Sequence, residues 1–139
     1  MLLLDNSAWA RLPSPTLADE RRAEIAELIR TSQAAVSLPF LLEAGYSARS
    51  GEDHTRMMVG LSRLPRLQIS AETEALALEV QSTLAEHGHH RVTPVDVIQA
   101  ALAHLAGTGV LHYDKDYDVL RDVGKLTFES VWLAPRGTL

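Results

Sequence analysis

The 139-residue chain contains no cysteine, which excludes disulfide bridges, thiolate metal sites and a cysteine nucleophile. Long apolar runs are also missing. The N-terminus offers only Leu2, Leu3 and Leu4 before Asp5, too few for a secretory signal, and no run approaches the ~18 apolar residues that span a bilayer. We therefore expect a cytoplasmic protein without a membrane partner, in which any metal site uses carboxylate or histidine.

Positive charge is scarce, with 13 basic residues against 18 acidic ones and a net charge of −5. No general field therefore attracts nucleic acid or anionic lipid, and any RNA contact must be local. Arg11, Arg49 and Arg91 are candidates for phosphate contacts, with a solvated surface position as the alternative for each. Since 46% of the residues are hydrophobic, we expect one globular domain over residues 1–139.

Short apolar runs alternate with amphipathic segments along the chain, which predicts crossover connections and a mainly parallel sheet. The expected class is α/β, with a short, mainly parallel central sheet flanked by helices on both faces. We expect strands at 1–4, 34–37, 67–69, 110–113 and 126–133, the last at a sheet edge, and helices at 7–11, 14–31, 39–46, 52–64, 71–87 and 94–106.

Two of the expected strands are followed by aspartate: Asp5 after the first and Asp114 after the strand at 110–113. In an open α/β sheet the ligand site lies beyond the carboxyl ends of the strands, so these carboxylates should share one edge. Asp96 lies in Thr93-Pro94-Val95-Asp96, which also fits a capping box. Glu43, surrounded by apolar neighbours at a helix start, either faces solvent or needs a partner for its charge.

The acidic run 114–118 superficially resembles a calcium loop, but an EF-hand requires Gly and Glu where Val119 and Lys125 stand. Asp116 remains a possible further ligand, and we interpret Asp118 as a cap or first-turn acid of a helix that includes Val119. Three histidines, His87, His89 and His90, lie at the C-terminal end of a helix, where a cationic histidine interacts favourably with the helix dipole. We therefore interpret them as structural residues rather than zinc ligands.

Asp5, Glu43, Asp96 and Asp114 thus lie at the ends of four separate elements. If they converge to about 4–5 Å, each charged pair costs on the order of 3–4 kcal/mol at an effective dielectric near 20. A small domain has only about 5–15 kcal/mol of stability, so such a cluster needs protons or a cation. Oxygen ligands favour a hard ion, Mg²⁺ or Mn²⁺.

Four segments together resemble the motifs of PIN-domain nucleases, in the same order and over essentially the full length, and the compact size is similar to VapC-type toxins of toxin–antitoxin pairs. These segments are 3–9, 38–43, 93–101 and 110–118. One departure is His112, where many members carry Thr two residues before the fourth acid.

The resemblance implies an endoribonuclease toxin, dependent on Mg²⁺ or Mn²⁺, that cuts selected RNAs and so inhibits translation. Its metal-binding, catalytic quartet would be Asp5, Glu43, Asp96 and Asp114, with Asp116 as an accessory acid and Ser7 as a hydroxyl near the metal. Asp5 and Asp96 are the expected direct ligands, whereas Glu43 and Asp114 would complete the coordination or orient the attacking water. The resemblance also implies a cognate VapB-type antitoxin and a homodimer.

The alternative function is a non-catalytic PIN-like interaction module, whose acidic pocket binds a partner or a structural ion. The complete acid quartet weighs against this alternative. A phosphoacceptor receiver domain is set aside, because it needs a lysine after a separate late strand and Lys115 directly follows Asp114.

Overall fold

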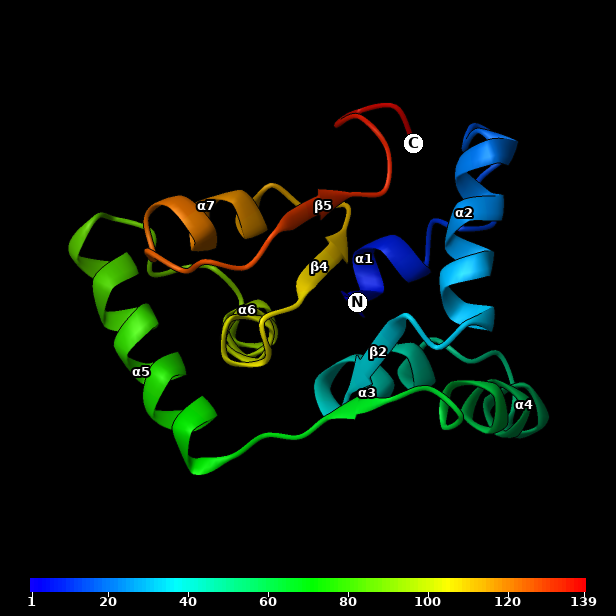
Figure 1. Ribbon diagram of the computed structural model, residues 1–139, viewed down its shortest axis with the longest axis horizontal. Helices are drawn as coiled ribbons and strands as arrows, with labels where there is room; N and C mark the ends of the chain where they lie inside the picture. The colour runs from blue at the N-terminus through cyan, green and yellow to red at the C-terminus, as the bar shows by residue number, and fades with distance from the viewer.

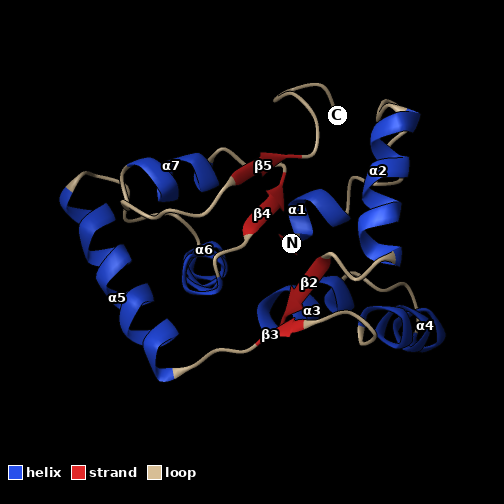
Figure 2. Ribbon diagram, viewed as in Figure 1, coloured by secondary structure: helices blue, strands red, loops and turns tan.

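A five-stranded, fully parallel sheet forms the centre of the computed structural model, which describes all of residues 1–139 (Figures 1 and 2). The strand order is β3-β2-β1-β4-β5. The strands are β1 (Leu2–Leu4), β2 (Ala34–Ser37), β3 (Arg66–Leu67), β4 (Gly109–His112) and β5 (Ser130–Trp132). The parallel sheet and the edge position of the last strand confirm the prediction, although β5 covers only three residues.

Helices cover both faces of this sheet, as predicted (Figure 1). They are α1 (Asn6–Trp9), α2 (Asp19–Arg30), α3 (Leu38–Tyr46), α4 (Gly51–Leu61), α5 (Ala71–Glu86), α6 (Pro94–Ala106) and α7 (Asp116–Asp122). Neighbouring strand residues alternate between two cores: Leu3 packs with α5, α6 and α7, and Leu4 packs with α1 to α4. None of the helices combines the length and the apolar character needed to cross a bilayer.

Local capping explains why the helices beside the strand ends begin where they do. The Ser37 hydroxyl accepts a hydrogen bond from the Phe40 amide at the start of α3, and Thr93 does the same for the Asp96 amide at the start of α6. Gly107 ends α6 in the left-handed conformation, at φ 67°. These caps place the first turns of α3 and α6 at the sheet edge where β1 and β2 end.

The predicted helix from Ser14 is wrong over its first turn, because α2 begins at Asp19. The reason lies in Arg22, whose guanidinium donates to the carbonyl oxygens of Leu12 and Ser14 at 2.9 and 2.7 Å. These contacts satisfy the backbone of an irregular segment that would otherwise favour a helix. A smaller difference occurs at α4, which ends three residues earlier than predicted. Helix α7 begins at Asp116 and holds Asp118 in its first turn, which confirms the interpretation of Asp118 as a cap or first-turn acid.

Candidate active site

Asp5 follows β1 directly and caps α1, so its carboxylate is held at the carboxyl end of the central strand. The side chain is buried. One oxygen, Oδ2, accepts hydrogen bonds from the Ser7 amide and hydroxyl at 2.9 and 2.5 Å. The Ser7 hydroxyl oxygen in turn accepts the backbone amide of Tyr113, just beyond β4, at 2.9 Å. Ser7 therefore joins the ends of β1 and β4 and orients Asp5.

Asp96 lies in the first turn of α6 and is also buried. The Tyr117 hydroxyl, fully buried in α7, donates to Asp5 Oδ1 at 2.6 Å and lies 3.3 Å from Asp96 Oδ1. Burial, together with the charges of Asp5 and Asp114, raises the pKa of Asp96 to about 7. Only the Thr93 half of the expected capping box forms, because the Asp96 carboxylate faces the other acids.

Asp114 and Asp116 lie between β4 and the first turn of α7. The Asp116 amide donates to Asp114 Oδ1 at 2.9 Å, and burial and the charge of Asp114 raise the pKa of Asp116. Carboxylate oxygens of Asp96, Asp114 and Asp116 all lie within 4.8 Å of one another. Asp116 is thus as close to this group as the two acids of the predicted quartet.

Glu43 of α3 is half-buried and lies outside that group of three. Burial raises its pKa, and the charge of Asp5 raises it further. With Asn6, Glu43 lines a surface hollow of about 530 Å³ whose walls are mainly apolar. The structure therefore brings all four acids of the predicted quartet to one end of the sheet, with Glu43 at its rim.

Three buried polar residues around the acids have no role in the sequence-based prediction. Gln99 of α6 donates to the Leu4 carbonyl oxygen at 2.9 Å and accepts from the Ser37 hydroxyl. Tyr117 joins Asp5 and Asp96 as described above, and His112 accepts the Asp114 amide at 3.1 Å. Gln99 and His112 are polar groups in largely apolar elements, which is the sequence signal that could have identified them, whereas Tyr117 lies in a charged helix that gives no such signal.

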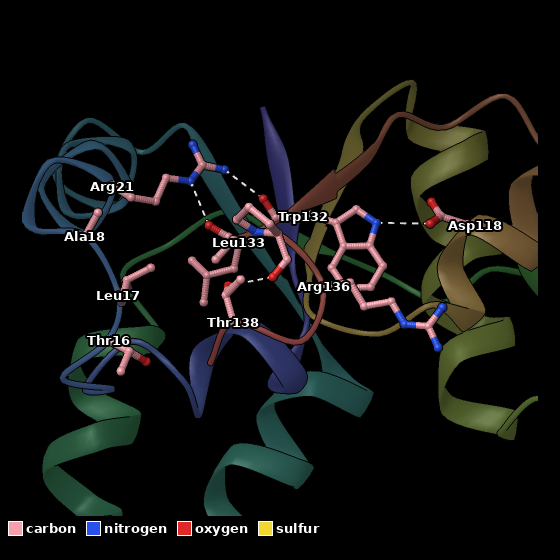
Figure 3. A pocket seen from close by; sticks show the side chains of 11 residues that line it. Thr16, Leu17, Ala18, Arg21, Asp118, Trp132, Leu133, Arg136 and Thr138 are labelled. Atoms are coloured by element: carbon pink, nitrogen blue, oxygen red, sulfur yellow. Dashed lines mark hydrogen bonds between the residues drawn. The ribbon is translucent and has the colours of Figure 1, made fainter.

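Among the arginines considered for phosphate contacts, Arg11 lies against Ser7 and Tyr113. Its guanidinium donates to the Ser7 carbonyl oxygen at 2.9 Å and lies 4.8 Å from the centre of the Tyr113 ring. Arg49 and Arg91 are exposed, and no side-chain hydrogen bond or ion pair holds either of them. A larger surface hollow, about 850 Å³, lies instead against β5 and α2, where Arg21 donates to the carbonyl oxygens of Trp132 and Leu133 (Figure 3).

The donor atoms at this end of the sheet are suited to a hard divalent cation. Every potential ligand in the group of three is a carboxylate oxygen, and no histidine belongs to it, which excludes a typical zinc site there. Burial, and then the nearby carboxylates without a compensating charge, raise the pKa of Asp96. The histidine at the end of α5, His87, bonds the Thr83 carbonyl oxygen and has the structural role expected of it.

Comparisons with known proteins agree with this architecture. The PIN domain family matches residues 2–125. The chain is 35% identical to Ribonuclease VapC18 of Mycobacterium tuberculosis over 98% of this chain and 97% of that protein. It is 34% identical to Ribonuclease VapC51 of the same organism, over 99% and 96% of the two chains.

Solved structures share the fold at lower identity. DNA-bound VapBC from Salmonella typhimurium has a TM-score of 0.69 at 22% identity, with 96% of this chain and 100% of that chain covered. FitAcB from Neisseria gonorrhoeae has a TM-score of 0.67 at 15% identity, with 94% and 97% covered. With its parallel sheet, its acids at the strand ends and full-length similarity to VapC proteins, the chain belongs to the PIN domain family.

Proposed function

We propose that this protein is a metal-dependent endoribonuclease toxin, which cuts selected RNAs to inhibit translation and is neutralised by a VapB-type antitoxin. The observation that carries the proposal is the convergence of carboxylates from the residue between β1 and α1, from α6 and from the loop after β4, with the pKa of Asp96 raised to about 7. Such crowding is costly unless a cation binds. The relatives VapC18 and VapC51 are both named ribonucleases, which supports RNA cleavage as the reaction of this protein.

Asp5, Asp96 and Asp114 are our proposed metal ligands, with Glu43 completing the coordination or orienting the attacking water. Asp116 lies close enough to Asp96 and Asp114 to contribute a further ligand oxygen. Ser7 holds Asp5 through two hydrogen bonds, so its hydroxyl positions a ligand. We propose Mg²⁺ or Mn²⁺ as the cofactor, because every donor is an oxygen atom.

Bound Mg²⁺ or Mn²⁺ would lower the pKa of a coordinated water and stabilise charge on the scissile phosphate. The residues of the chain would supply the arrangement around it. The carboxylate of Glu43, at the rim and with a raised pKa, could accept a proton from the attacking water. Arg11, on the Tyr113 ring, offers a guanidinium to a neighbouring RNA phosphate.

The proposed partners are an antitoxin that covers the acids and a second copy of the chain. Exposed apolar side chains on α3, Leu38, Leu42 and Tyr46, lie beside Glu43 and supply a surface for such contacts. The structural neighbours named VapBC and a toxin–antitoxin complex from Klebsiella pneumoniae support an antitoxin partner. We propose that residues 1–139 act as one nuclease domain in the cytoplasm, where translated RNA is found.

The test is cleavage of a labelled total-RNA pool by antitoxin-free protein with Mn²⁺ or Mg²⁺. We expect discrete cuts that disappear in Asp96→Asn and with a chelator. A matched control, Glu86→Gln, removes an exposed acid of α5 and should cut as the wild type does. Absence of cleavage by metal-loaded wild-type protein would contradict the enzyme and favour the non-catalytic interaction module.

A further inference from the structure

His112, the last residue of β4, is completely buried two residues before Asp114. Its ring packs between two aromatic side chains: Tyr117 at 4.8 Å and Trp132 at 5.0 Å between ring centres. An imidazole in such a place needs a partner for each nitrogen, because an unsatisfied buried polar atom costs about 1–3 kcal/mol. Both nitrogens have one.

Two hydrogen bonds connect the ring to different parts of the fold. Nδ1 accepts the backbone amide of Asp114 at 3.1 Å, and Nε2 lies 2.7 Å from the Ser130 hydroxyl of β5. Ser130 then donates to Asp118 Oδ1 at 2.6 Å. The other oxygen, Asp118 Oδ2, accepts the indole N–H of Trp132 at 3.0 Å, the contact drawn in Figure 3.

These contacts determine which nitrogen carries the proton. Since an amide can only donate, Nδ1 must be unprotonated to accept the Asp114 N–H. The Ser130 hydroxyl donates its hydrogen to Asp118 Oδ1. The Ser130 oxygen must therefore accept a hydrogen bond from His112 Nε2–H. Asp118, interpreted from the sequence as a cap or first-turn acid, therefore also orients a hydroxyl that sets the imidazole tautomer.

We propose that His112 is a positioning residue for the acid cluster, which holds the Asp114 backbone through Nδ1 while Ser130, Asp118 and Trp132 hold its ring. The edge strand β5 and α7 thereby take part in shaping the metal site. This inference rests on the proposed function, because it assumes that Asp114 binds the metal.

Two amide substitutions separate the contacts of the ring. In His112→Asn the side-chain oxygen lies as many bonds from Cβ as Nδ1 does, so the acceptor for Asp114 is kept. In His112→Gln the amide reaches the position of Nε2, so the Ser130 contact is kept and the acceptor for Asp114 is lost. A matched control is His104→Gln, because His104 Nδ1 accepts the Thr127 amide at 3.1 Å away from the acids.

The first measurement is the Mn²⁺ dissociation constant, determined by electron paramagnetic resonance, with melting temperatures recorded in parallel. We expect His112→Gln to bind Mn²⁺ about 10–100-fold more weakly than the wild type, the usual cost of losing a group that orients a ligand. His112→Asn and the control His104→Gln should stay close to the wild type. Equal affinity in His112→Gln and the wild type would overturn the inference.

The second measurement is the ¹⁵N spectrum of the imidazole in metal-free protein, which does not depend on metal binding. We expect an unprotonated Nδ1 and a protonated Nε2, and the reverse would overturn the inference. Failure of the proposed function would look different. In that case wild-type protein would bind no Mn²⁺, while the imidazole would still show the expected tautomer.

Discussion

Asp96 is the carboxyl group whose protonation the fold changes most clearly. Its pKa is raised from an ordinary 3.8 to about 7, chiefly by burial and then by the charge of Asp5. In the unfolded chain Asp96 loses its proton near pH 3.8, whereas in the folded protein Asp96 keeps its proton up to about pH 7. Stability from this group is therefore complete below the unfolded pKa and is lost as the pH rises through the folded pKa.

We expect metal-free protein to be easier to unfold at about pH 8 than at about pH 5, with each unit of pKa difference worth about 1.4 kcal/mol. Asp96→Asn removes this ionisation, so the variant should lose less stability over the same range. Urea unfolding with a chelator at both pH values measures the effect, with Glu86→Gln as the control. Equal pH dependence in Asp96→Asn and the wild type would contradict the explanation.

Tyr117 supplies the one hydroxyl that contacts both Asp5 and Asp96. Tyr117→Phe keeps the ring and removes this donor, so we expect metal-free protein to lose about 1–3 kcal/mol, the cost of a buried acceptor without its partner. Bound Mn²⁺ would neutralise the same carboxylates, so the loss should shrink when the ion is added. Thermal unfolding with and without Mn²⁺ measures both quantities.

The control for this variant is Tyr113→Phe, which removes a hydroxyl that accepts the Leu139 amide in the C-terminal segment. Its response to Mn²⁺ should match that of the wild type, because the Tyr113 hydroxyl has no contact with the acids. A loss of stability in Tyr117→Phe that is the same with and without Mn²⁺ would show that the hydroxyl acts independently of the metal site.

At the scale of elements, Gln99 determines how α6 is joined to the sheet. Its amide bonds the Leu4 carbonyl oxygen at the end of β1 and the Ser37 hydroxyl at the end of β2. In Gln99→Leu the Leu4 carbonyl oxygen would lose this donor and the Ser37 hydroxyl would lose the acceptor for its hydrogen, although the Ser37 oxygen would still accept the Phe40 amide. We expect the free energy of unfolding to fall by about 2–6 kcal/mol, from two lost partners at about 1–3 kcal/mol each.

Urea unfolding of Gln99→Leu beside Gln81→Leu tests this role, because Gln81 is an exposed residue of α5. The control should change stability by less than about 0.5 kcal/mol, as surface substitutions usually do. If both variants lost the same stability, the buried amide could not be what joins α6 to the strand ends.

The helix starts that the sequence predicts correctly depend on residues only a few positions apart. Ser70 and Thr93-Pro94 mark the starts of α5 and α6, and Gly107 marks the end of α6. The start of α2 was wrong because Arg22, outside the predicted first turn, bonds the carbonyl oxygens of Leu12 and Ser14. A local pattern carries no information about such a contact.

The site shows the same division between local and distant information. The acids could be predicted, because strand ends and helix starts are local features and parallel strands bring them to one edge. Their supporting contacts could not, since Tyr117 and Asp5 are 112 residues apart and Ser37 and Gln99 are 62 apart. That Asp116 lies beside Asp96 likewise depends on where α7 begins.

At the scale of the whole molecule, the net charge of −5 gives RNA no general attraction to this protein. Local contacts, such as Arg11 on the Tyr113 ring, would then carry more of the binding than a broad basic surface. A dimer would add to this, because two copies present two sites to one RNA. The oligomeric state is therefore linked to how the proposed substrate is held.

The α3 surface is our proposed dimer contact, since Leu42 and Tyr46 are 64% and 93% exposed there. We expect Leu42→Glu to convert a dimer into a monomer, because burying an unpaired carboxylate costs more than an apolar contact supplies. Light scattering after size-exclusion chromatography measures the mass. The control Leu78→Glu changes an equally prominent leucine on α5, 70% exposed, and should remain dimeric.

Leu42→Glu also tests whether the metal site lies within one chain, because Leu42 is next to Glu43 of that site. Leu42 points outward, whereas the acids are held by Ser7, Tyr117 and the strand ends, so Leu42→Glu should still gain stability from Mn²⁺. At a concentration 100 times the dissociation constant, that gain is about 2.7 kcal/mol. A monomer that keeps the full gain would place the metal site within one chain, and a monomer that loses it would mean that the second copy completes the site.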